Sequence, residues 1–442
     1  MLHGLRRRAS GHHHLLTGSV ALVLTAGVQA LSGALFWLIA ARVDTQTDVG
    51  HATALFTSAL FVAFVAGLGQ PVAAARYAAG RTRDDHVLYA WGALATVAAS
   101  ALAAVGYLLV VSPQAVDELR AWNSTFGPIL FVFLCMGTAL SLLLDVRLMT
   151  QRRWGLVLAR ASIVGVARFP LLLLPVDGDR AVWLLLVAAL PTAALGFVGM
   201  GLLPKVTGDR HHLRPLPVTT RAMVRYSIVN WASTLTYQAP TFAMPVIVLI
   251  NVDADLNASF YVAWGVAALA CYVPTAIGQA LLAEGGRDGA HLRSQVRLGI
   301  VVAGGLMVVG AAAATLGRDL IVTLYGADYR EAADVLPALV VAAVPWAVTS
   351  IYLTEARVRH RSGATVLITA VLSLAILVPA LVLVPEDGIE GAATAFLVGN
   401  IVAAVVALGI HVQGRSTADD DLLATAPVDF EPEDAIALTP LA

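Results

Sequence analysis

The sequence predicts an all-α protein that crosses a membrane many times, and three observations support this fold class. Of the 442 residues, 58% are hydrophobic and only 13% are charged, whereas soluble domains carry about 25% charged residues. The mean hydropathy is +0.79. Apolar stretches of about 20 residues, enough for a helix to cross the roughly 30 Å hydrocarbon layer, recur along the whole chain. The 28 basic and 29 acidic residues are too few to cover the surface of several soluble domains.

Twelve stretches satisfy this length criterion. They lie near 15–42, 50–76, 87–111, 126–149, 155–174, 181–203, 222–250, 258–283, 296–316, 332–354, 363–384 and 389–413. The first one follows three arginines and imitates a secretory signal, but it is much longer than the 7–15 apolar residues of such a signal. We therefore expect it to remain in the protein as the first of about twelve transmembrane helices.

The basic residues predict how these helices are oriented. With the N-terminus placed inside, the cytoplasmic segments hold 22 of the 28 basic residues and the outer loops hold five. This asymmetry is a strong positive-inside signal. The sequence therefore predicts a multi-pass protein of the plasma membrane with both termini in the cytoplasm.

The two halves of the chain repeat each other at an offset of about 210 residues. Four matches occur in order: Val43-Asp44 with Val252-Asp253, Gly69-Gln70 with Gly278-Gln279, Asp145-Val-Arg147 with Glu355-Ala-Arg357, and Pro175-Val-Asp177-Gly178 with Pro385-Glu-Asp387-Gly388. Six spans per half make this a parallel repeat. Transporters built from repeats bind their substrate at the interface between them, so the architecture indicates transport.

The repeat also predicts the domain organisation. We expect a cytoplasmic N-terminal segment at 1–14, an N-lobe of spans one to six at 15–207, and a C-lobe of spans seven to twelve at 208–415. Residues 416–442 contain acidic residues and no basic ones, which predicts a disordered cytoplasmic tail.

Four segments carry a resemblance to a known family. They are FWLIAARVDTQTDVGHATAL at 36–55, GLGQPVAAARY at 67–77, DLIVTLYGADYREAADVLPAL at 319–339 and VPEDGIEGAATAFLVGN at 384–400. Their order and spacing resemble the polysaccharide-export branch of the multidrug/oligosaccharidyl-lipid/polysaccharide flippase superfamily over roughly residues 15–413. The resemblance implies a MATE-like fold of two six-helix lobes around a central cavity, in a protein that moves lipid-linked sugars or other amphiphiles across the membrane.

Signs of enzymatic chemistry are weak in this sequence. A phosphate-binding P-loop requires a Gly-x-x-x-x-Gly-Lys motif, and the only lysine, Lys205, follows Pro204. The acidic pairs Asp177/Asp179 and Asp253/Asp255 lie in short outer loops, where we interpret them as solvated turn residues. The sequence therefore predicts no enzyme, no metal site and no cofactor, and it leaves any coupling ion unidentified.

Arg168 is the most informative single residue. If the fifth span begins near Gly155, Arg168 lies about 20 Å along it at 1.5 Å per residue. A central arginine costs roughly 2.5–3.5 kcal/mol on insertion scales, so intramembrane arginines usually face a cavity or a partner. A guanidinium binds phosphate oxygens through two parallel bonds and would suit a diphosphate-linked lipid. The alternative is that Arg168 extends to the outer interface, helped by a kink at Pro170.

Other polar residues are candidates for binding the substrate. Uncharged polar side chains within spans can bond between helices or contact sugars, and arginines at span ends can line the mouth of a cavity or anchor the helix. The candidates for substrate binding are Arg168, Arg42, Arg76, Gln29, Gln70, Asn230 and Gln279.

A second group is predicted to act in gating or structure. Asp145/Arg147 and Glu355/Arg357 stand at cytoplasmic ends of spans four and ten, and residues two apart do not face each other on a helix. We expect each to pair with a neighbouring helix or loop as a latch, with substrate contact as the alternative. Pro240 and Pro245 interrupt span seven, where freed carbonyl groups are tolerated only if buried or beside a water-filled cavity.

The function predicted by the resemblance and the internal arginines is a flippase for a lipid-linked oligosaccharide or polysaccharide precursor. Its expected partners are this lipid-linked sugar, membrane lipids and polysaccharide-assembly proteins, without nucleic acid, and we expect a monomer. The alternatives are a cation-coupled multidrug exporter, a membrane glycan polymerase or ligase, and a non-transporting scaffold. The lack of acidic residues inside spans one and two disfavours the exporter, and outer loops of at most about 15 residues disfavour the polymerase.

The basic asymmetry generates a testable topology. Single cysteines placed at Ser112 and Asp387 should react with a membrane-impermeant maleimide added to intact cells, whereas a cysteine at Arg210 should react only after lysis. Labelling of position 210 from outside intact cells would reverse the predicted orientation.

Overall fold

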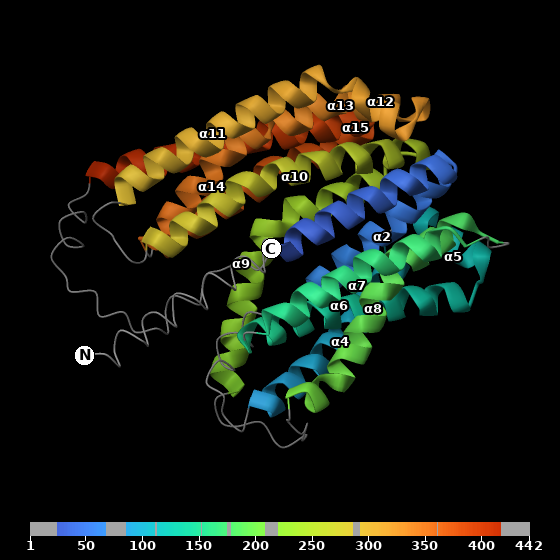
Figure 1. Ribbon diagram of the computed structural model, residues 1–442. Coiled ribbons are helices and arrows are strands. Elements are labelled where there is room, and N and C mark those ends of the chain that lie inside the picture. The colour runs from blue at the N-terminus through green and yellow to red at the C-terminus, as the bar shows by residue number, and fades with distance from the viewer. Residues whose placement is uncertain are drawn as a thin grey trace. The chain divides into compact units, whose positions relative to one another are not determined.

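The computed structural model describes residues 24–67, 85–110, 113–151, 153–174, 178–207, 220–285, 292–359 and 361–416 (Figure 1). Every regular element in these ranges is a helix. The predicted N-terminal segment at 1–14 and the acidic tail after residue 416 lie outside the described residues. The all-α fold class is therefore confirmed.

The first half of the chain forms long helices and one short one. They are the helix Leu24–Val43, α2 (Gln46–Ala66), α4 (Asp85–Val110), α5 (Pro113–Trp122), α6 (Phe126–Thr150), α7 (Trp154–Leu172) and α8 (Arg180–Thr207). The short helix α5 carries an exposed ion pair between Asp117 and Arg120, and sequence analysis treated it as loop.

The second half follows the same order. Its elements are α9 (Thr220–Leu249), α10 (Ala254–Gly285), α11 (Leu292–Leu316), the short α12 (Asp319–Tyr325), η2 (Ala327–Tyr329), α13 (Arg330–Val341), α14 (Ala343–Val358) and α15 (Ser362–Ser416). In both halves the third long helix is followed by a short one.

Two glycines also occupy equivalent places in the repeat. Gly178 and Gly388 both have a positive φ angle, +152° and +59°, a conformation that glycine adopts at no steric cost. Both end a Pro-x-Asp-Gly sequence between the last two spans of a half. The internal repeat predicted from the sequence is thus confirmed by the order of its helices and by its turns.

Ten helices in the described ranges are long and apolar enough to cross a membrane. One of them, Gly363–Gln413, includes the predicted spans eleven and twelve. It belongs to α15, which consists of two helices joined at Gly388, where the backbone is not helical. In addition, α9 covers the predicted span seven. The predicted span ten is divided at Ala342 into α13 and α14, since Pro345 has no N–H to donate to the Val341 carbonyl.

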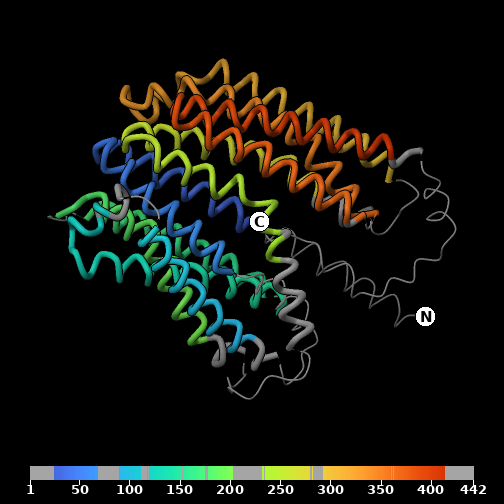
Figure 2. Tube along the Cα trace, turned by 180° about the vertical axis from the view of Figure 1, so that it is seen from behind, coloured from blue at the N-terminus to red at the C-terminus, as the bar shows by residue number. Residues whose placement is uncertain are grey.

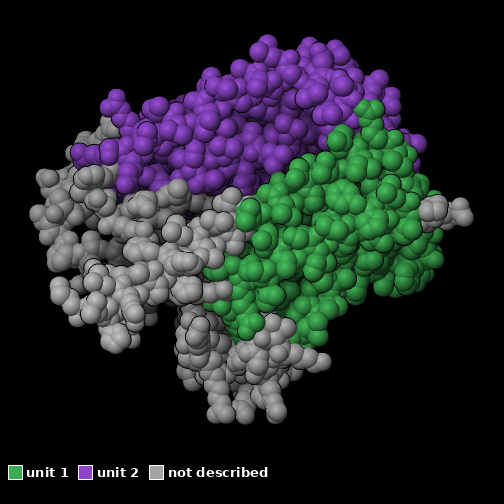
Figure 3. Space-filling model, in the orientation of Figure 1, with its two compact units in different colours: residues 1–44, 58–231 green, residues 45–57, 232–442 purple. Residues whose placement is uncertain are grey.

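Contacts divide the chain into two compact units, coloured separately in Figure 3. Unit 1 comprises residues 1–44 and 58–231, and unit 2 comprises 45–57 and 232–442. The first turns of α2 therefore belong to the unit that contains the second half of the chain, while the rest of α2 belongs to unit 1. The lobes expected from the sequence are simpler, with one boundary between residues 207 and 208.

Within unit 1, glycines allow α6 and α8 to approach closely. A Cβ atom built on Gly196 of α8 would lie 2.1 Å from the carbonyl oxygen of Gly137 on α6, and one on Gly137 would lie 2.5 Å from the Ala193 Cβ. Small residues of this kind let helix backbones meet in membranes, where packing and not hydrophobicity drives association.

Within unit 2, α10, α11, α14 and α15 run side by side, as Figures 1 and 2 both show. Their core includes the fully buried Ala303, Ala347 and Ile351. The Trp346 indole N–H donates to the Cys271 carbonyl oxygen at 2.9 Å and joins α14 to α10.

Aliphatic side chains cover much of the outer surface of these helices. Leu102, Leu109 and Val110 on α4 are 75%, 77% and 85% exposed, and Leu316 on α11 is 86% exposed. Exposed apolar side chains in such numbers are unusual for a soluble monomer and suit a lipid environment. The structure thus agrees with a multi-pass membrane protein.

The close approach of α6 and α8 can be tested by adding a large side chain at the contact. Replacing Gly196 by Leu should destabilise unit 1 by about 1–3 kcal/mol or more, because the new side chain must displace backbone. The matched control is Gly201→Leu on the same helix, where nothing lies within 4 Å of a built Cβ atom. Fluorescence-detected thermal unfolding in detergent should show a lower midpoint for Gly196→Leu alone. Equal midpoints for both variants would contradict this packing.

Candidate functional site

A buried ion pair joins α6 to α7 in unit 1. Both carboxylate oxygens of Asp145 on α6 accept bonds from Arg160 on α7, with Nε–Oδ1 at 2.7 Å and a second bond from Nη2 to Oδ2. Arg160 also donates to the Ser141 hydroxyl. The side chains of Arg160 and Asp145 are only 10% and 16% exposed. A two-pronged guanidinium–carboxylate pair of this kind fixes both distance and orientation.

The second residue of this sequence pair points elsewhere. Arg147 is 3% exposed, and its guanidinium carbon lies 3.8 Å from the centre of the Tyr89 ring of α4. An arginine over an aromatic face gains cation–π attraction, which is larger where water is excluded. Asp145 and Arg147 therefore connect α6 to two different helices.

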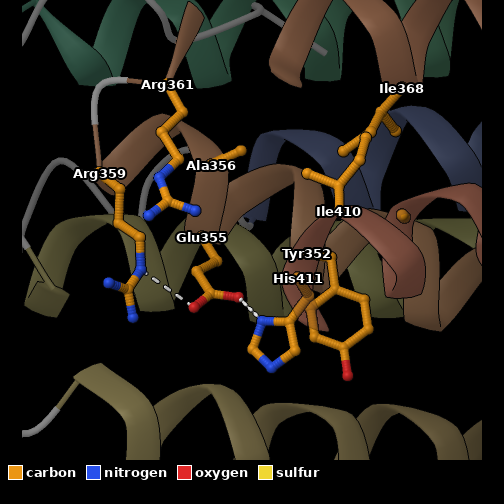
Figure 4. Close-up of a pocket in the computed structure, with 9 residues that line it drawn as sticks. Tyr352, Glu355, Ala356, Arg359, Arg361, Ile368, Ile410 and His411 are labelled. Atoms are coloured by element: carbon orange, nitrogen blue, oxygen red, sulfur yellow. Dashed lines mark hydrogen bonds and ion pairs between the residues drawn. The ribbon is translucent and has the colours of Figure 1, made fainter. Parts of the chain in front are cut away.

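Unit 2 contains an equivalent cluster at Glu355, shown in Figure 4. Glu355 of α14 is 4% exposed, and its Oε1 atom accepts a bond from Arg359 Nε at 3.0 Å. Its Oε2 atom lies 2.5 Å from Nδ1 of His411 on α15, whose ring stacks on Tyr352 at 4.3 Å between centroids. These side chains line a pocket between α14 and α15.

Arg357 in unit 2 repeats the behaviour of Arg147. Its guanidinium carbon lies 5.4 Å from the centre of the Tyr237 ring on α9. Both halves therefore use the same pattern: an acidic residue held by a cation, and an arginine two residues later over a tyrosine ring.

A third polar contact holds the first turns of α2 to α10 inside unit 2. The Gln46 amide donates to the Asp255 carbonyl, the Ser259 hydroxyl and the Asp328 carbonyl at 3.0, 3.1 and 2.9 Å. The Thr47 hydroxyl donates to the Asp255 carboxylate at 2.7 Å. We call this set of hydrogen bonds the α2–α10 contact.

The α2–α10 contact continues one turn deeper. Asn257 is 4% exposed and its amide donates to the Gly50 carbonyl at 3.0 Å and to the Thr53 hydroxyl at 3.3 Å. A Cβ atom on Gly50 would lie 1.9 Å from the Ala254 carbonyl oxygen, so only glycine allows the two helices to meet there.

Arg168 lies inside unit 1 between three helices. Its guanidinium Nη2 donates to the Ala188 carbonyl of α8 at 2.8 Å, and its carbon lies 5.9 Å from the Phe36 ring of the helix Leu24–Val43. One turn before Arg168, a Cβ atom on Gly165 would lie 2.8 Å from Ser32 of that first helix. The half-buried arginine thus borders a tight α7 packing site.

Comparison with solved structures identifies this arrangement of helices. The chain is similar to the lipid II flippase MurJ in an inward closed conformation, with a TM-score of 0.71 at 12% identity over 96% of both chains. It is also similar to a multidrug resistance MATE family transporter of the MOP superfamily in an inward-facing conformation, with a TM-score of 0.68 at 13% identity, over 90% of this chain and 99% of that one. The chain has the MATE-like fold. No family model and no curated protein sequence matches it.

An outward-facing multidrug resistance MATE transporter is similar as well, with a TM-score of 0.59 at 16% identity over 91% and 97% of the two chains. The MATE-like fold predicted from the sequence is therefore confirmed over nearly the whole length. At these identities the likeness concerns the fold, and the residues of the chain itself must carry the argument about substrate.

The predicted substrate-binding residues are dispersed in the MATE-like fold. Gln29 and Arg42 are exposed on the helix Leu24–Val43. Asn230 lies in α9 and Gln279 in α10, at positions whose side chains are not described. Arg76 and Gln70 lie outside the described residues. The substrate-binding role of these residues stays a prediction.

Each of the two prolines in α9 lacks the N–H that would otherwise bond to a carbonyl of the preceding turn. Pro240 has no N–H to donate to the Thr236 carbonyl, and the Ser373 hydroxyl of α15 donates to that oxygen instead. Pro245 lies five residues further along the same helix. A neighbouring helix thus provides the hydrogen bond that Pro240 removes.

Sequence reasoning missed the partners in these clusters. Arg160, Arg359 and Arg361 entered it only as positive-inside charges, and His411 and Gln46 were not considered. Asp44 likewise accepts a bond from Arg180 Nε at 2.6 Å. The acidic residues at the helix ends were a signal that partners exist. Arg359 lies four positions after Glu355, as helical periodicity allows, but Arg160, His411 and Arg180 lie 15, 56 and 136 positions from the acidic residues that they contact, and periodicity does not pair them.

The Asp145–Arg160 pair can be tested by a double-mutant cycle. Replacing either residue alone by Leu should destabilise unit 1 by about 3–5 kcal/mol, because the other charge remains buried without its partner. Replacing both should cost much less than the sum of the two changes. Thermal unfolding of the three variants in detergent measures the coupling. Additive effects would show that the pair contributes no interaction energy.

Proposed function

We propose that the chain is a flippase that moves a lipid-linked oligosaccharide or polysaccharide precursor from the cytoplasmic to the outer leaflet. The single observation that carries the proposal is the similarity to the lipid II flippase MurJ over 96% of both chains, at a TM-score of 0.71. The half-buried Arg168, in an apolar span, adds a phosphate-binding group of the kind that a diphosphate-linked lipid requires.

The proposed movement is alternating access of the two repeated halves. The helix α2 supports this, because its residues up to Thr57 belong to unit 2 and its later residues to unit 1. In the proposed movement, α2 bends between these two parts or one part is released from the unit that holds it. Asp145 and Glu355 are proposed as latches at the opposite ends of the spans, where each tightens a helix pair within its own half.

A cation-coupled multidrug exporter is the second candidate, and the similarity to multidrug resistance MATE transporters favours it. The helix Leu24–Val43 contains no acidic residue, and neither does α2 after Asp48. Exporters that exchange cations need a carboxylate in a span to carry them. In spans four and ten the carboxylates of Asp145 and Glu355 already bind Arg160, and Arg359 with His411, respectively. This difference favours the flippase.

The proposal also includes the topology, the oligomeric state and the partners of the protein. Both termini lie in the cytoplasm, the chain acts as a monomer, and its partners are the lipid-linked sugar, membrane lipids and polysaccharide-assembly proteins. No nucleic acid takes part.

Substitutions of Arg168 distinguish a role in substrate binding from a structural role. Arg168→Ala should abolish export of the glycan with protein abundance near wild type. Arg168→Lys should restore it only in part, because an ammonium keeps the charge and loses the two-pronged geometry. Arg168→Gln should behave like the alanine variant. Surface glycan is measured in a deletion strain complemented by each variant and is normalised to protein in the membrane.

The matched control is Arg120→Ala, since Arg120 is an exposed residue on the short helix α5 with an ion pair to Asp117. It should export glycan at the wild-type level. Because Arg168 donates to the Ala188 carbonyl, the thermal midpoint of each purified variant is measured as well. Wild-type glycan export by Arg168→Ala at equal abundance would reject the binding role and leave Arg42 and Arg76 as the next candidates.

A further inference from the structure

Two buried hydroxyl groups of unit 1 lack a hydrogen-bond partner among the described residues. They belong to Thr96 and Ser100 of α4, which are 1% and 0% exposed. A buried hydroxyl without a partner is costly, and native proteins pair the large majority of such groups with protein atoms or with ordered water. These two hydroxyls therefore need an explanation.

Other helices of the chain show the usual arrangement for such side chains. Thr275, Thr315 and Thr354 each donate to the carbonyl oxygen four residues earlier, at 3.0, 2.8 and 2.9 Å. This bond satisfies a hydroxyl within its own helix. Although α4 is described throughout this stretch, Thr96 and Ser100 do not make it. Their hydroxyls are not held by the carbonyls of α4.

The face of α4 that carries these hydroxyls packs against α6. Tyr89 and Tyr107 lie on the same face, because steps of four or seven residues return to one side of a helix. The Tyr89 hydroxyl lies 3.1 Å from that of Thr150 on α6, and the Tyr107 ring stacks on Phe131 of α6 at 5.9 Å between centroids. Since both ends of this face contact α6, its middle lies against α6 as well.

Two hydroxyls of α6 lie between these contacts. The Ser141 hydroxyl accepts a bond from Arg160 of α7. Thr138 is 5% exposed and lies seven residues after Phe131, on the side of α6 that faces α4. Thr138 is therefore the α6 hydroxyl that lies across from the middle of the α4 face.

The repeat provides an internal comparison. α11 is the third long helix of the second half, as α4 is of the first, and its buried face has the same spacing. At an offset of 207 residues the corresponding positions are Gly92 and Gly299, Thr96 and Ala303, Ser100 and Met307, and Ala104 and Ala311. Unit 2 thus has apolar side chains at the two positions where unit 1 has hydroxyls. The fold does not require polar groups there.

We propose that ordered water binds between α4 and α6 inside unit 1, hydrogen-bonded to Thr96, Ser100 and Thr138. Buried water typically makes about three hydrogen bonds to groups that would otherwise be unpaired. Each of the three hydroxyls can donate or accept, so they can satisfy both the hydrogens and the lone pairs of a water molecule. This site does not depend on the proposed flippase function.

Bound water makes the third helix of the two units pack differently. In unit 2, Ala303 and Met307 of α11 pack in an apolar core with Ala347 and Ile351 of α14. In unit 1, α4 meets α6 partly through water, which can bridge two polar groups nearly as well as a direct hydrogen bond. The α4–α6 interface therefore contains polar contacts that the corresponding interface of α11 replaces by apolar packing.

A thermal double-mutant cycle on the full chain tests the site. Thr96→Val and Ser100→Ala should each lower the unfolding midpoint in detergent by about 2–4 °C, the shift expected for roughly one lost hydrogen bond in a unit of this size. The double variant should lose less than the sum, because both hydroxyls bind the same water. The matched control, Ser124→Ala at an exposed serine before α6, should keep the wild-type midpoint.

Two results of this cycle would overturn the proposal. A higher midpoint in the single variants would show hydroxyls without water, whose removal relieves a cost. Additive losses would show that the two hydroxyls act independently and share no ligand.

A second measurement detects the water itself. Brief X-ray irradiation generates hydroxyl radicals from water, bound internal water included, and these oxidise the nearest side chains. Cys135 is 0% exposed and lies four residues after Phe131 on α6, so the proposed water would be its nearest source of radicals. Mass spectrometry should find Cys135 oxidised in the wild type and severalfold less in the double variant.

The control in the same experiment is Cys271, which packs against the apolar core of α11 in unit 2. Its oxidation should be the same in the wild type and in the double variant. Equal oxidation of Cys135 in the two proteins would reject bound water at this place. Glycan export is not measured, so failure here leaves the proposed flippase function untouched.

Discussion

The high cost of a polar or charged group in a low-dielectric layer explains the buried polar pairs of this structure. With no water in the hydrocarbon core, a carboxylate, a guanidinium or a freed carbonyl must find its partner within the protein. Asp145 finds Arg160, Glu355 finds Arg359 and His411, and the carbonyl of Thr236 receives the Ser373 hydroxyl because Pro240 donates nothing. Each of these bonds joins neighbouring helices or fixes the end of one. The pairing of polar groups thus determines which helix faces meet at these places, as the packing of small residues does between α6 and α8.

The two repeated halves share an arrangement of helices but hold their equivalent carboxylates with different residues. Both halves place a carboxylate and an arginine two residues later at the same helix end, and both arginines lie over a tyrosine ring. The partners of the carboxylates differ, however. The unit 1 pair is made by an arginine of the next helix, α7, whereas the unit 2 pair is made partly by a histidine of α15. Equivalent carboxylates in the two halves are therefore held by different residue types from different elements.

The sequence predicted much of the fold because the membrane restricts the possibilities. Apolar length defines the spans, and the offset of 210 residues placed Gly178 and Gly388 at corresponding turns, which the structure confirms. Apolar length did not predict that span ten is divided at Ala342 or that α5 and α12 are helices. Short amphipathic helices are not distinguished from loops by apolar length.

The candidate site was less predictable. Arg168 was identified from its cost in a span, but its contact with the Ala188 carbonyl depends on the packing of α7 against α8. The partners of Asp145 and Glu355 depend on packing in the same way. A sequence shows that a buried charge needs a partner, and only the packing of helices shows which residue provides it.

The contacts of this fold differ in how easily they can be released, and this difference bears on the proposed movement. Alternating states must lie within a few kcal/mol of each other for both to be populated. Where Gly137 and Gly196 meet, backbone packs on backbone, and separating α6 from α8 would lose many contacts for which water is no substitute. The α2–α10 contact combines a close backbone approach at Gly50 with hydrogen bonds such as those of Gln46 and Thr47. Each of these hydrogen bonds has a net contribution of about 0.5–1.5 kcal/mol, because water can replace the partner. We therefore infer that α6 and α8 move as one body in the proposed movement, and that the hydrogen bonds of Gln46 and Thr47 are the contacts of α2 that water can most easily replace.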